Sequence, residues 1–283
     1  MDAVMGIIKK VYYAFVKLPI RMRLLIMASF FIILFVASVN IKQHNNDGEK
    51  IYDKSGQSEN NHGNNSDSSD DVDEEENSIP VPKEVKVVID PGHGGEDLGA
   101  TKGDLYEKKL NLDISKKLGK ILKGLDINVV YTREEDVDVG LDERVNIANR
   151  LDATLFISVH NNYMPNDAGY KGTETLYCPP VNAKEDKLDG MKLAAIVQKR
   201  LVNGLNTVDN GIIYRPNLVV LRKTNMPAVI AEIAYMSNSS DRSKLMDDGF
   251  RQKAAKALAE AVMESLEFMK AEKNEEGKWM IMD

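Results

Sequence analysis

Two histidines stand out because each directly follows an apolar run that is typical of a buried β-strand. His93 lies in the glycine-rich turn of VVIDPGHGG, and His160 lies in SVHNN, directly after ATLFISV. They are the only histidines after residue 80. A lone histidine is more often structural than functional, but both of these occupy the carboxyl end of a predicted strand, where open α/β sheets bind their ligands. The pair is therefore a candidate for one site.

Two carboxylates lie at comparable points along the chain. Glu107 begins the first predicted helix after the PGHGG turn, and Glu232 lies near the end of PAVIAEIAYMS. An acid among apolar residues is costly to bury unless it is paired, and a perturbed carboxylate in a cleft is a candidate functional group. The alternative for Glu232 is an acid that ends a strand and meets solvent, but apolar neighbours on both sides favour a functional role.

Two imidazole nitrogens and one carboxylate form a His₂Glu donor set, which suits zinc. In catalytic zinc sites of this composition, the fourth ligand position is open for water or substrate. The spacing is far longer than that of an HExxH motif, so the fold must bring the ligands together. A second carboxylate beside the water takes its proton and passes it to the leaving group. The pattern therefore predicts a metal-dependent hydrolase.

Strands and helices alternate from residue 82 onward. Apolar residues between Leu110 and Ile121 recur at intervals of four, four and three, as in a helix that packs by one face. The predicted strands are 85–89, 127–133, 153–159, 173–178, 218–222 and 227–237. The first predicted helix begins at Glu107, and three more cover 141–152, 187–204 and 251–269. This order predicts an α/β domain over 82–272, with a single, mostly parallel twisted sheet flanked by helices, and a tail at 273–283.

The first 39 residues have the composition of a membrane anchor. Leu24 to Val39 is apolar and uncharged for sixteen residues, slightly short of the roughly 20 that cross a bilayer squarely. Lysines and arginines precede it, which favours a cytoplasmic N-terminus. We therefore predict a basic amphipathic cytoplasmic segment at 1–23, an uncleaved signal anchor at 24–39, and an extracytoplasmic location for the domain that follows. A cleaved signal peptide, which would release a secreted protein, and a buried core helix are the alternatives.

The segment between anchor and domain is acidic and polar. Residues 43–80 contain two lysines against eleven acids, whereas residues 81–283 carry a net charge of only −3. Because such a composition cannot bury enough apolar surface to offset its ordering entropy, we predict a disordered linker over 40–81. The mildly acidic domain gives no electrostatic case for nucleic-acid binding. The single cysteine, Cys178, excludes an intramolecular disulfide and a cysteine-based zinc site.

Five ordered blocks carry a resemblance to a known family: DPGHGGEDLGA, YEKKLNLDIS, TREEDVDVGLDERVNIAN, SVHNN and AEIAYMSNSSDRSKL. Over residues 85–269 the chain is similar to the zinc-dependent N-acetylmuramoyl-L-alanine amidases of the amidase-3 family. The resemblance implies that His93, Glu107 and His160 bind one zinc ion and that Glu232 is the catalytic acid/base. It also implies that the chain acts on peptidoglycan, where it cuts the amide between the lactyl group of muramic acid and the first L-alanine of the stem peptide.

The sequence departs from the family pattern after the second histidine. Asn161 stands where the family commonly has a small residue, and Asn162 stands at the usual asparagine. We predict that both contact substrate. Arg133 and Arg144 are either contacts to substrate carboxylates or structural ion pairs.

A catalytic core on a membrane anchor resembles the germination-specific branch of the family. Members of that branch act on spore cortex peptidoglycan, where removal of the peptide allows muramic δ-lactam to form. The resemblance thus implies a domain that faces the spore intermembrane space, and a vegetative role at the cell wall is the alternative. Since no wall-binding repeat is recognisable, an accessory activating protein is also expected. Two rival functions are a zinc peptidase that cuts within stem peptides and an inactive or partner-dependent, membrane-tethered peptidoglycan-binding protein.

Overall fold

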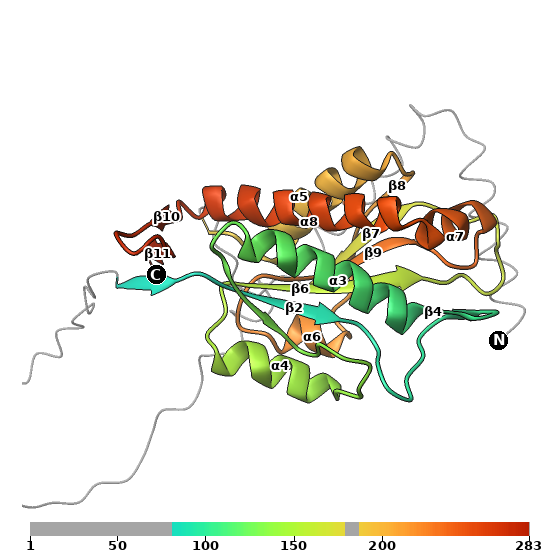
Figure 1. Cartoon of the computed structure of the whole chain (residues 1–283), viewed down its shortest axis with the longest axis horizontal. Helices are drawn as coiled ribbons and strands as arrows, with labels where there is room; N and C mark the ends of the chain where they lie inside the picture. Colours follow the sequence, from blue (N-terminus) through green and yellow to red (C-terminus); the bar gives the residue numbers. More distant parts are fainter. Residues whose placement is uncertain (1–80, 179–186, 283) are drawn as a thin grey trace, which may run out of the picture. The chain divides into compact units, whose positions relative to one another are not determined.

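A computed structural model describes residues 81–178 and 187–282 (Figure 1). The segments predicted as the cytoplasmic segment and the anchor, and nearly all of the predicted linker, lie outside these residues. Within the described ranges, no helix combines the length and the apolarity that a membrane crossing needs.

The centre of the domain is a six-stranded sheet. In spatial order its strands are β5 (Asn128–Tyr131), β2 (Lys86–Pro91), β6 (Leu155–Asn162), β9 (Ala228–Tyr235), β7 (Thr173–Tyr177) and β8 (Asp209–Tyr214). The first four strands are parallel to one another, β7 is antiparallel to β9, and β8 is parallel to β7. The prediction of a mostly parallel sheet is therefore confirmed, and the carboxyl ends of β2, β6 and β9 meet at one edge.

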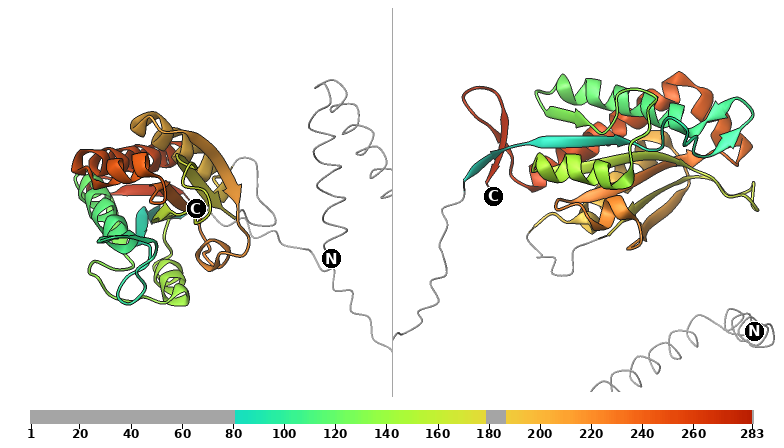
Figure 2. Two further views of the ribbon diagram at one scale, coloured as in Figure 1. Left: turned by 90° about the vertical axis from the view of Figure 1, so that its right-hand side faces the viewer. Right: turned by 90° about the horizontal axis from the view of Figure 1, so that it is seen from below.

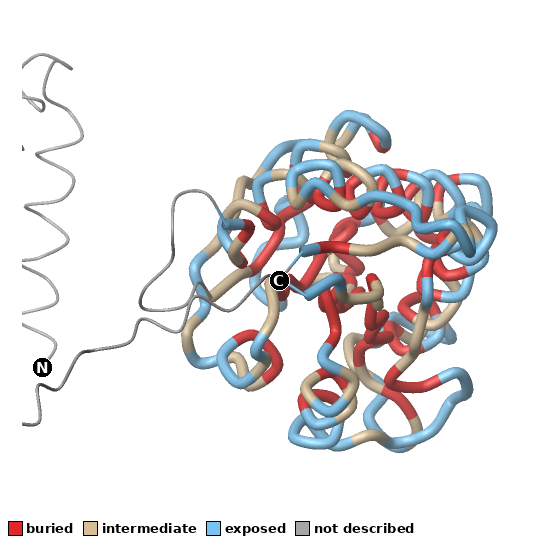
Figure 3. Tube along the Cα trace, turned by 90° about the vertical axis from the view of Figure 1, so that its left-hand side faces the viewer, coloured by how far each residue is buried: buried red, intermediate tan, exposed pale blue. Residues whose placement is uncertain are grey.

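Helices cover both faces of this sheet (Figures 1 and 2). One face carries α3 (Glu107–Lys123), α5 (Gly190–Leu205) and α8 (Asp248–Phe268), and the other carries α4 (Leu141–Arg150) and the one-turn α6 (Val219–Arg222). The short α7 (Ser239–Met246) precedes α8. Figure 3 shows the buried residues at the centre of the domain, between these helical layers.

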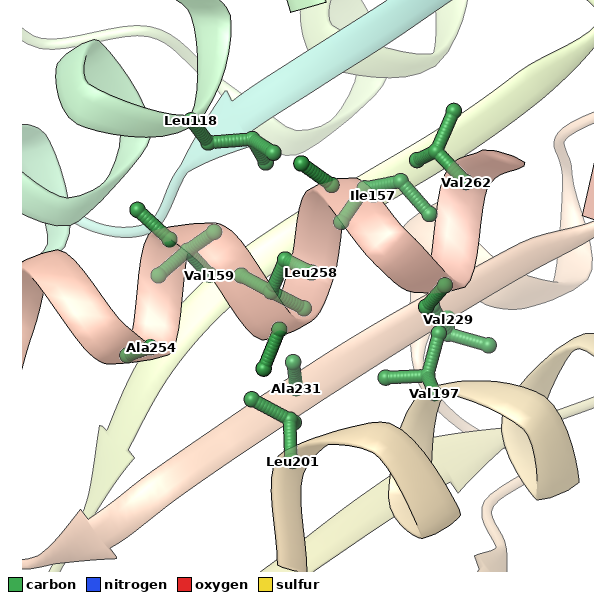
Figure 4. Close-up of a cluster of buried hydrophobic side chains, with 14 of the residues drawn as sticks. Leu118, Ile157, Val159, Val197, Leu201, Val229, Ala231, Ala254, Leu258 and Val262 are labelled. Carbon is green, nitrogen blue, oxygen red and sulfur yellow. The ribbon is translucent and has the colours of Figure 1, made fainter. Parts of the chain in front are cut away.

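The larger hydrophobic core lies between the sheet and α3, α5 and α8 (Figure 4). Val159 of β6 and Ala231 of β9 have no exposed surface, and neither have Ala254 and Leu258 of α8. Small alanines along α8 let the helix approach the β-branched surface of the strands closely. Since strands buried on both faces read as continuous apolar runs, this packing explains why β6 and β9 were recognisable in the sequence.

Two elements of the central layers differ from the sequence predictions, and the predicted tail at 273–283 contains a short strand, Trp279–Met282. The predicted strand at 218–222 is wrong, because Val219–Arg222 forms α6. Its amides bond locally, as in Arg222 N to Leu218 O at 3.0 Å, and its apolar residues Val220 and Leu221 are buried on the α4 face. In the sheet, β9 is flanked by β6 and β7, so residues 218–222 have no open position beside β9 in which to pair as a strand. The edge strand β8 was not predicted, since its first residues, Asp209, Asn210 and Gly211, are typical of a turn.

Two small sheets complete the described fold. β1 (Pro82–Glu84), β11 (Trp279–Met282) and β10 (Glu272–Lys273) form an antiparallel sheet at the start of β2. β3 (Thr101–Lys102) and β4 (Leu105–Tyr106) form a hairpin directly before α3. Because β1 leads into the amino end of β2, the chain enters the domain at the end of β2 opposite to the carboxyl edge that carries His93.

Candidate metal centre and active site

The turn after β2 holds His93 in an unusual backbone conformation. His93 has φ = +60°, a region that non-glycine residues rarely adopt, and the two glycines after it also have positive φ. Arg133, a buried residue, stabilises the turn by donating from Nε to Pro91 O and from Nη2 to Gly92 O, each at 2.9 Å. Its guanidinium therefore supports the turn from inside the protein.

A buried ion pair fixes the same turn from the α4 side. Arg144 Nη1 lies 2.6 Å from Asp90 Oδ1, and Arg144 Nη2 donates to His93 O at 2.8 Å. Ser158 and Thr132 also donate to the Asp90 carboxylate, each at 2.6 Å. Burial opposes ionisation of Asp90, but the Arg144 charge and these hydrogen bonds outweigh it and lower the pKa of Asp90. The structural alternative for Arg144 is confirmed.

The structure brings the three predicted metal ligands together. His93 Nε2 lies 3.1 Å from Glu107 Oε2, and His160 Nδ1 lies 3.0 Å from Glu107 Oε1. One donor atom from each residue lies within 4.8 Å of the others. His93 comes from the turn after β2, His160 from β6, and Glu107 from the first position of α3, so three separate elements build the cluster.

Glu107 is almost fully buried, and the protein holds both of its oxygens. Ala100 N donates to Oε2 at 2.8 Å, while Asn161 N and Asn111 Nδ2 donate to Oε1 at 3.1 and 3.2 Å. Burial alone would raise the pKa of Glu107, but the hydrogen bonds and charges of the two histidines hold that pKa well below its usual range. Glu107 is therefore a pre-organised anion.

The two imidazoles are basic in the absence of a metal. Burial would lower the pKa of His93, but hydrogen bonds to Glu107 and Asp97 outweigh it and raise that pKa to about 9. Burial also opposes the charge on His160, yet the Glu107 hydrogen bond and the Glu232 and Glu107 charges raise its pKa. Asp97 lies 2.7 Å from His93 Nδ1, so it orients the ring with Nε2 toward Glu107, as carboxylates behind metal-bound histidines do.

This donor set fits zinc, because two imidazoles, one ionised carboxylate and an orienting acid are what a catalytic zinc site requires.

The protonation of the ligands predicts that metal binding is coupled to proton release. A histidine with a pKa near 9 carries a proton at pH 7, and that proton must leave before the nitrogen can bind a metal. We expect zinc binding at pH 7 to release about one to two protons per ion and apparent affinity to rise between pH 6 and 9. Calorimetry in buffers of different ionisation enthalpy measures the number, and a value near zero would contradict the protonated state.

Glu232 lies beside this cluster on the next strand. It is the register partner of His160, so the two side chains leave the same face of the sheet. Its Oε2 atom is buried and has no hydrogen-bond partner within residues 81–178 and 187–282. The pKa of Glu232 is raised to about 7, chiefly by burial; the His160 charge opposes this rise, and the charges of Glu107 and Glu174 add to it. A carboxyl that exchanges its proton near neutral pH suits general acid–base chemistry.

Three residues that the sequence analysis did not single out surround Glu232 or the ligands. Glu174 of β7 is the register partner of Glu232, and it accepts hydrogen bonds from Asn162 Nδ2 at 2.7 Å and Tyr235 Oη at 3.0 Å. Asn111 and Asp97 support Glu107 and His93. The sequence offered the same indication for Glu174 as for Glu232, because each is an acid within a predicted strand: Glu174 lies in TETLY and Glu232 in AVIAEIAY.

Asn161 and Asn162 are both engaged by protein groups. The side chain of Asn161 is buried and donates to Asn111 Oδ1 at 2.8 Å. Asn162 donates to Glu174, and its Oδ1 accepts from Tyr163 N at 2.8 Å. The substrate contact that we predicted for these two residues stays a prediction, since the structure gives their side chains supporting contacts within the protein.

Gly92 is required by the close approach of His160. A Cβ atom added at Gly92 would lie 2.1 Å from His160 Nε2. We expect Gly92→Ala to displace the His160 ring and to lower metal affinity by about 10–100-fold, as loss of a supporting contact typically does. Gly124→Ala is the control, because a Cβ there, at the far end of α3, meets Ile121 O at 3.3 Å and Lys120 O at 3.5 Å and no site residue. Zinc titration of both variants checks this, and unchanged affinity in Gly92→Ala would contradict the geometry.

A cleft of about 370 Å³ opens beside the two histidines, and we call it the α4–α6 cleft. Its lining includes His93, His160, the start of α4, the α6 segment and Ile230. A larger hollow of about 750 Å³ lies between α3, α8 and Trp279, and it contains none of the predicted site residues. The α4–α6 cleft is therefore the candidate substrate site.

Comparison with known proteins gives a family match over most of the domain. Residues 87–264 match the Amidase_3 family, described as N-acetylmuramoyl-L-alanine amidase. The chain is 38% identical over 180 residues to the N-acetylmuramoyl-L-alanine amidase LytC of Bacillus subtilis, covering 63% of this chain and 35% of that protein. It is 32% identical over 188 residues to the sporulation-specific N-acetylmuramoyl-L-alanine amidase of the same species, covering 66% and 70%.

Solved structures show the same fold. The catalytic domain of the amidase CwlV from Bacillus (Paenibacillus) polymyxa var. colistinus aligns with a TM-score of 0.59 at 34% identity, covering 65% of this chain and 99% of that one. The CwlD amidase from Clostridioides difficile, solved in complex with the GerS lipoprotein, also aligns with a TM-score of 0.59, at 26% identity, covering 65% and 98%.

Proposed function

We propose a mechanism for this chain, which belongs to the Amidase_3 family of N-acetylmuramoyl-L-alanine amidases. In this proposal the chain cuts peptidoglycan with one zinc ion, which His93, Glu107 and His160 would hold. Glu232 is the catalytic acid/base. The enzyme hydrolyses the amide between N-acetylmuramic acid and the L-alanine of the stem peptide. The observation that carries the proposed roles is the position of Glu232, whose unpartnered Oε2 lies beside a His–Glu–His cluster.

The metal would supply a Lewis acid that polarises the scissile carbonyl and acidifies a water molecule. The protein supplies the rest. Glu107, a pre-organised anion, balances the charge of a divalent ion, and Asp97 orients His93. Glu232 accepts a proton from the attacking water and delivers it to the departing alanine nitrogen. A pKa of about 7 allows the carboxyl to do both at neutral pH.

Metal removal tests the cofactor part of this proposal. The full chain should hold one zinc ion, lose hydrolysis when a chelator removes it, and regain hydrolysis when zinc is returned. His160→Ala should abolish stoichiometric zinc, whereas His62→Ala, far away in the sequence, should not. Elemental analysis of the three proteins gives the answer. Zinc retained at one ion per chain in His160→Ala, or full activity after complete chelation, would contradict the assignment.

We place this activity in spore cortex maturation, where removal of the stem peptide allows muramic δ-lactam to form before germination. The similarity to a sporulation-specific amidase and to the CwlD amidase supports this role. Cells lacking the gene should then form spores whose cortex contains no muramic δ-lactam, which muropeptide analysis measures. Normal δ-lactam content in those spores would favour the vegetative alternative.

The proposed location is the extracytoplasmic side of a membrane, with residues 24–39 as an uncleaved anchor. The apolar sequence of that segment and its cationic flank support this. N-terminal sequencing of the membrane-bound protein distinguishes an intact anchor from a cleaved signal peptide.

An accessory activating protein is also proposed, because the CwlD relative was solved with a lipoprotein partner. If the purified chain binds zinc stoichiometrically without help, a partner needed for metal loading is excluded.

A further inference from the structure

The scissile amide divides the substrate into two chemically different halves. One half is the muramoyl glycan, and the other is the stem peptide. We propose that the α4–α6 cleft binds the N-acetylated sugar of the glycan half and that the stem peptide leaves the site on the side of β9 and β7. This inference rests on the proposed function, because it uses the role assigned to Glu232.

The position of Glu232 gives the direction. A general acid must lie within hydrogen-bond reach of the atom it protonates, which here is the alanine nitrogen. The peptide therefore starts next to Glu232, on β9. The lining of the α4–α6 cleft includes His93 and His160 but not Glu232. In the sheet order β2, β6, β9, β7, His93 follows β2, His160 lies on β6 and Glu232 lies on β9. The muramoyl glycan, which is the half of the substrate that carries the scissile carbonyl, therefore faces the cleft.

The chemistry of the lining favours an uncharged ligand with apolar faces. The cleft walls include Val139, Leu141, Leu218, Val219, Val220 and Ile230. The exposed acids Asp97 and Asp138 lie at its rim. Among the described residues that line the cleft, Arg144 is the only arginine. It is not available to a ligand, because its Nε, Nη1 and Nη2 atoms bind Val139 O, Asp90 and His93 O, and its side chain is 5% exposed.

These features discriminate between the two halves of the substrate. A stem peptide carries carboxylates, which the acidic rim repels and which find no free guanidinium in the cleft. An N-acetylated sugar carries no charge and presents apolar C–H surfaces. The volume of about 370 Å³ also falls within the roughly 300–1,000 Å³ of small-molecule sites. Leu141, at the mouth of the cleft, is 56% exposed and would be covered by the bound sugar.

An internal competition between two substrates tests the inference. The zinc-loaded full chain is given equal amounts of a disaccharide-tetrapeptide and of the corresponding lactyl-tetrapeptide, which lacks the sugars. Mass spectrometry of the products gives the ratio of the two kcat/KM values. We expect the wild type to prefer the disaccharide substrate by at least tenfold. Leu141→Trp, which fills the cleft mouth, should reduce that preference at least tenfold.

The control is Leu125→Trp, an equally large change at a leucine that is 39% exposed and lies two residues beyond the carboxyl end of α3. It should leave both rates unchanged. A wild-type ratio near one, an unchanged ratio in Leu141→Trp, or an equal loss of both reactions in a folded Leu141→Trp protein would overturn the sugar assignment. Failure of the proposed function looks different, because the wild type would then release no peptide beginning with L-alanine from either substrate.

Discussion

Glu232→Gln should lower kcat by about 10²–10⁴-fold, the range that a positioned general acid–base contributes. The substitution keeps the shape of the side chain and removes the group that exchanges a proton near pH 7. It should not reduce stability, since the buried Oε2 atom has no hydrogen-bond partner to lose and a neutral amide costs less to bury than an ionised carboxylate. Zinc content should stay at one ion per chain. Steady-state hydrolysis of a muropeptide, with a thermal melt of the same protein, measures both effects.

Glu260→Gln provides the matched control, because Glu260 is a half-exposed glutamate on α8 in an ion pair with Arg200 at 3.8 Å. It should leave kcat unchanged. Hydrolysis by Glu232→Gln within tenfold of the wild type would refute its role as the acid/base. A large loss of zinc in Glu232→Gln would instead make it a fourth metal ligand.

Asp90→Asn should destabilise the domain by about 3–5 kcal/mol, because removing one partner of a buried ion pair leaves the other charge uncompensated. Asp90 is 1% exposed and Arg144 is 4% exposed, and the pair holds the turn that carries His93. The pKa of Asp90 is lowered below its ordinary 3.8 in the folded state. Its contribution is therefore present above about pH 4 and is lost as the pH falls through the lowered pKa.

Denaturant unfolding of Asp90→Asn at pH 7 and at pH 3 measures this contribution, and the difference from the wild type should shrink at the lower pH. The comparison is Glu143→Gln, which breaks the exposed pair between Glu143 and Arg150 at 2.7 Å. Exposed pairs contribute about 0–1 kcal/mol. A loss in Asp90→Asn as small as that in Glu143→Gln would show that the buried pair does not stabilise the turn.

The positions of His93, His160 and Glu232 were predictable from the sequence for one physical reason. Each follows or ends an apolar run, and parallel strands bring their carboxyl ends to the same edge of a sheet. Glu107 was placed by the start of the α3 periodicity, and the helix does begin at that residue. These inferences need only the direction of the strands and not their side-chain contacts.

The surroundings of Glu232 were not predictable in the same way. Glu174 lies beside Glu232 only because β7 runs antiparallel to β9, and the apolar pattern of TETLY carries no information about strand direction. The α6 segment reads as a strand from its β-branched residues, but its place beside β9 is taken by β7, so its backbone bonds locally. Both cases depend on contacts between distant segments, which override local propensity.

We propose that the His93–Glu107–His160 cluster and Glu232 together cut the bond between muramic acid and L-alanine. Mass spectrometry of purified peptidoglycan treated with the zinc-loaded full chain tests it most directly, with Glu232→Gln treated in parallel. The wild-type digest alone should contain free stem peptides that begin with L-alanine and glycan strands whose muramic lactyl groups end in a free carboxyl. Peptide fragments cut within the stem, or equal release by Glu232→Gln, would contradict it.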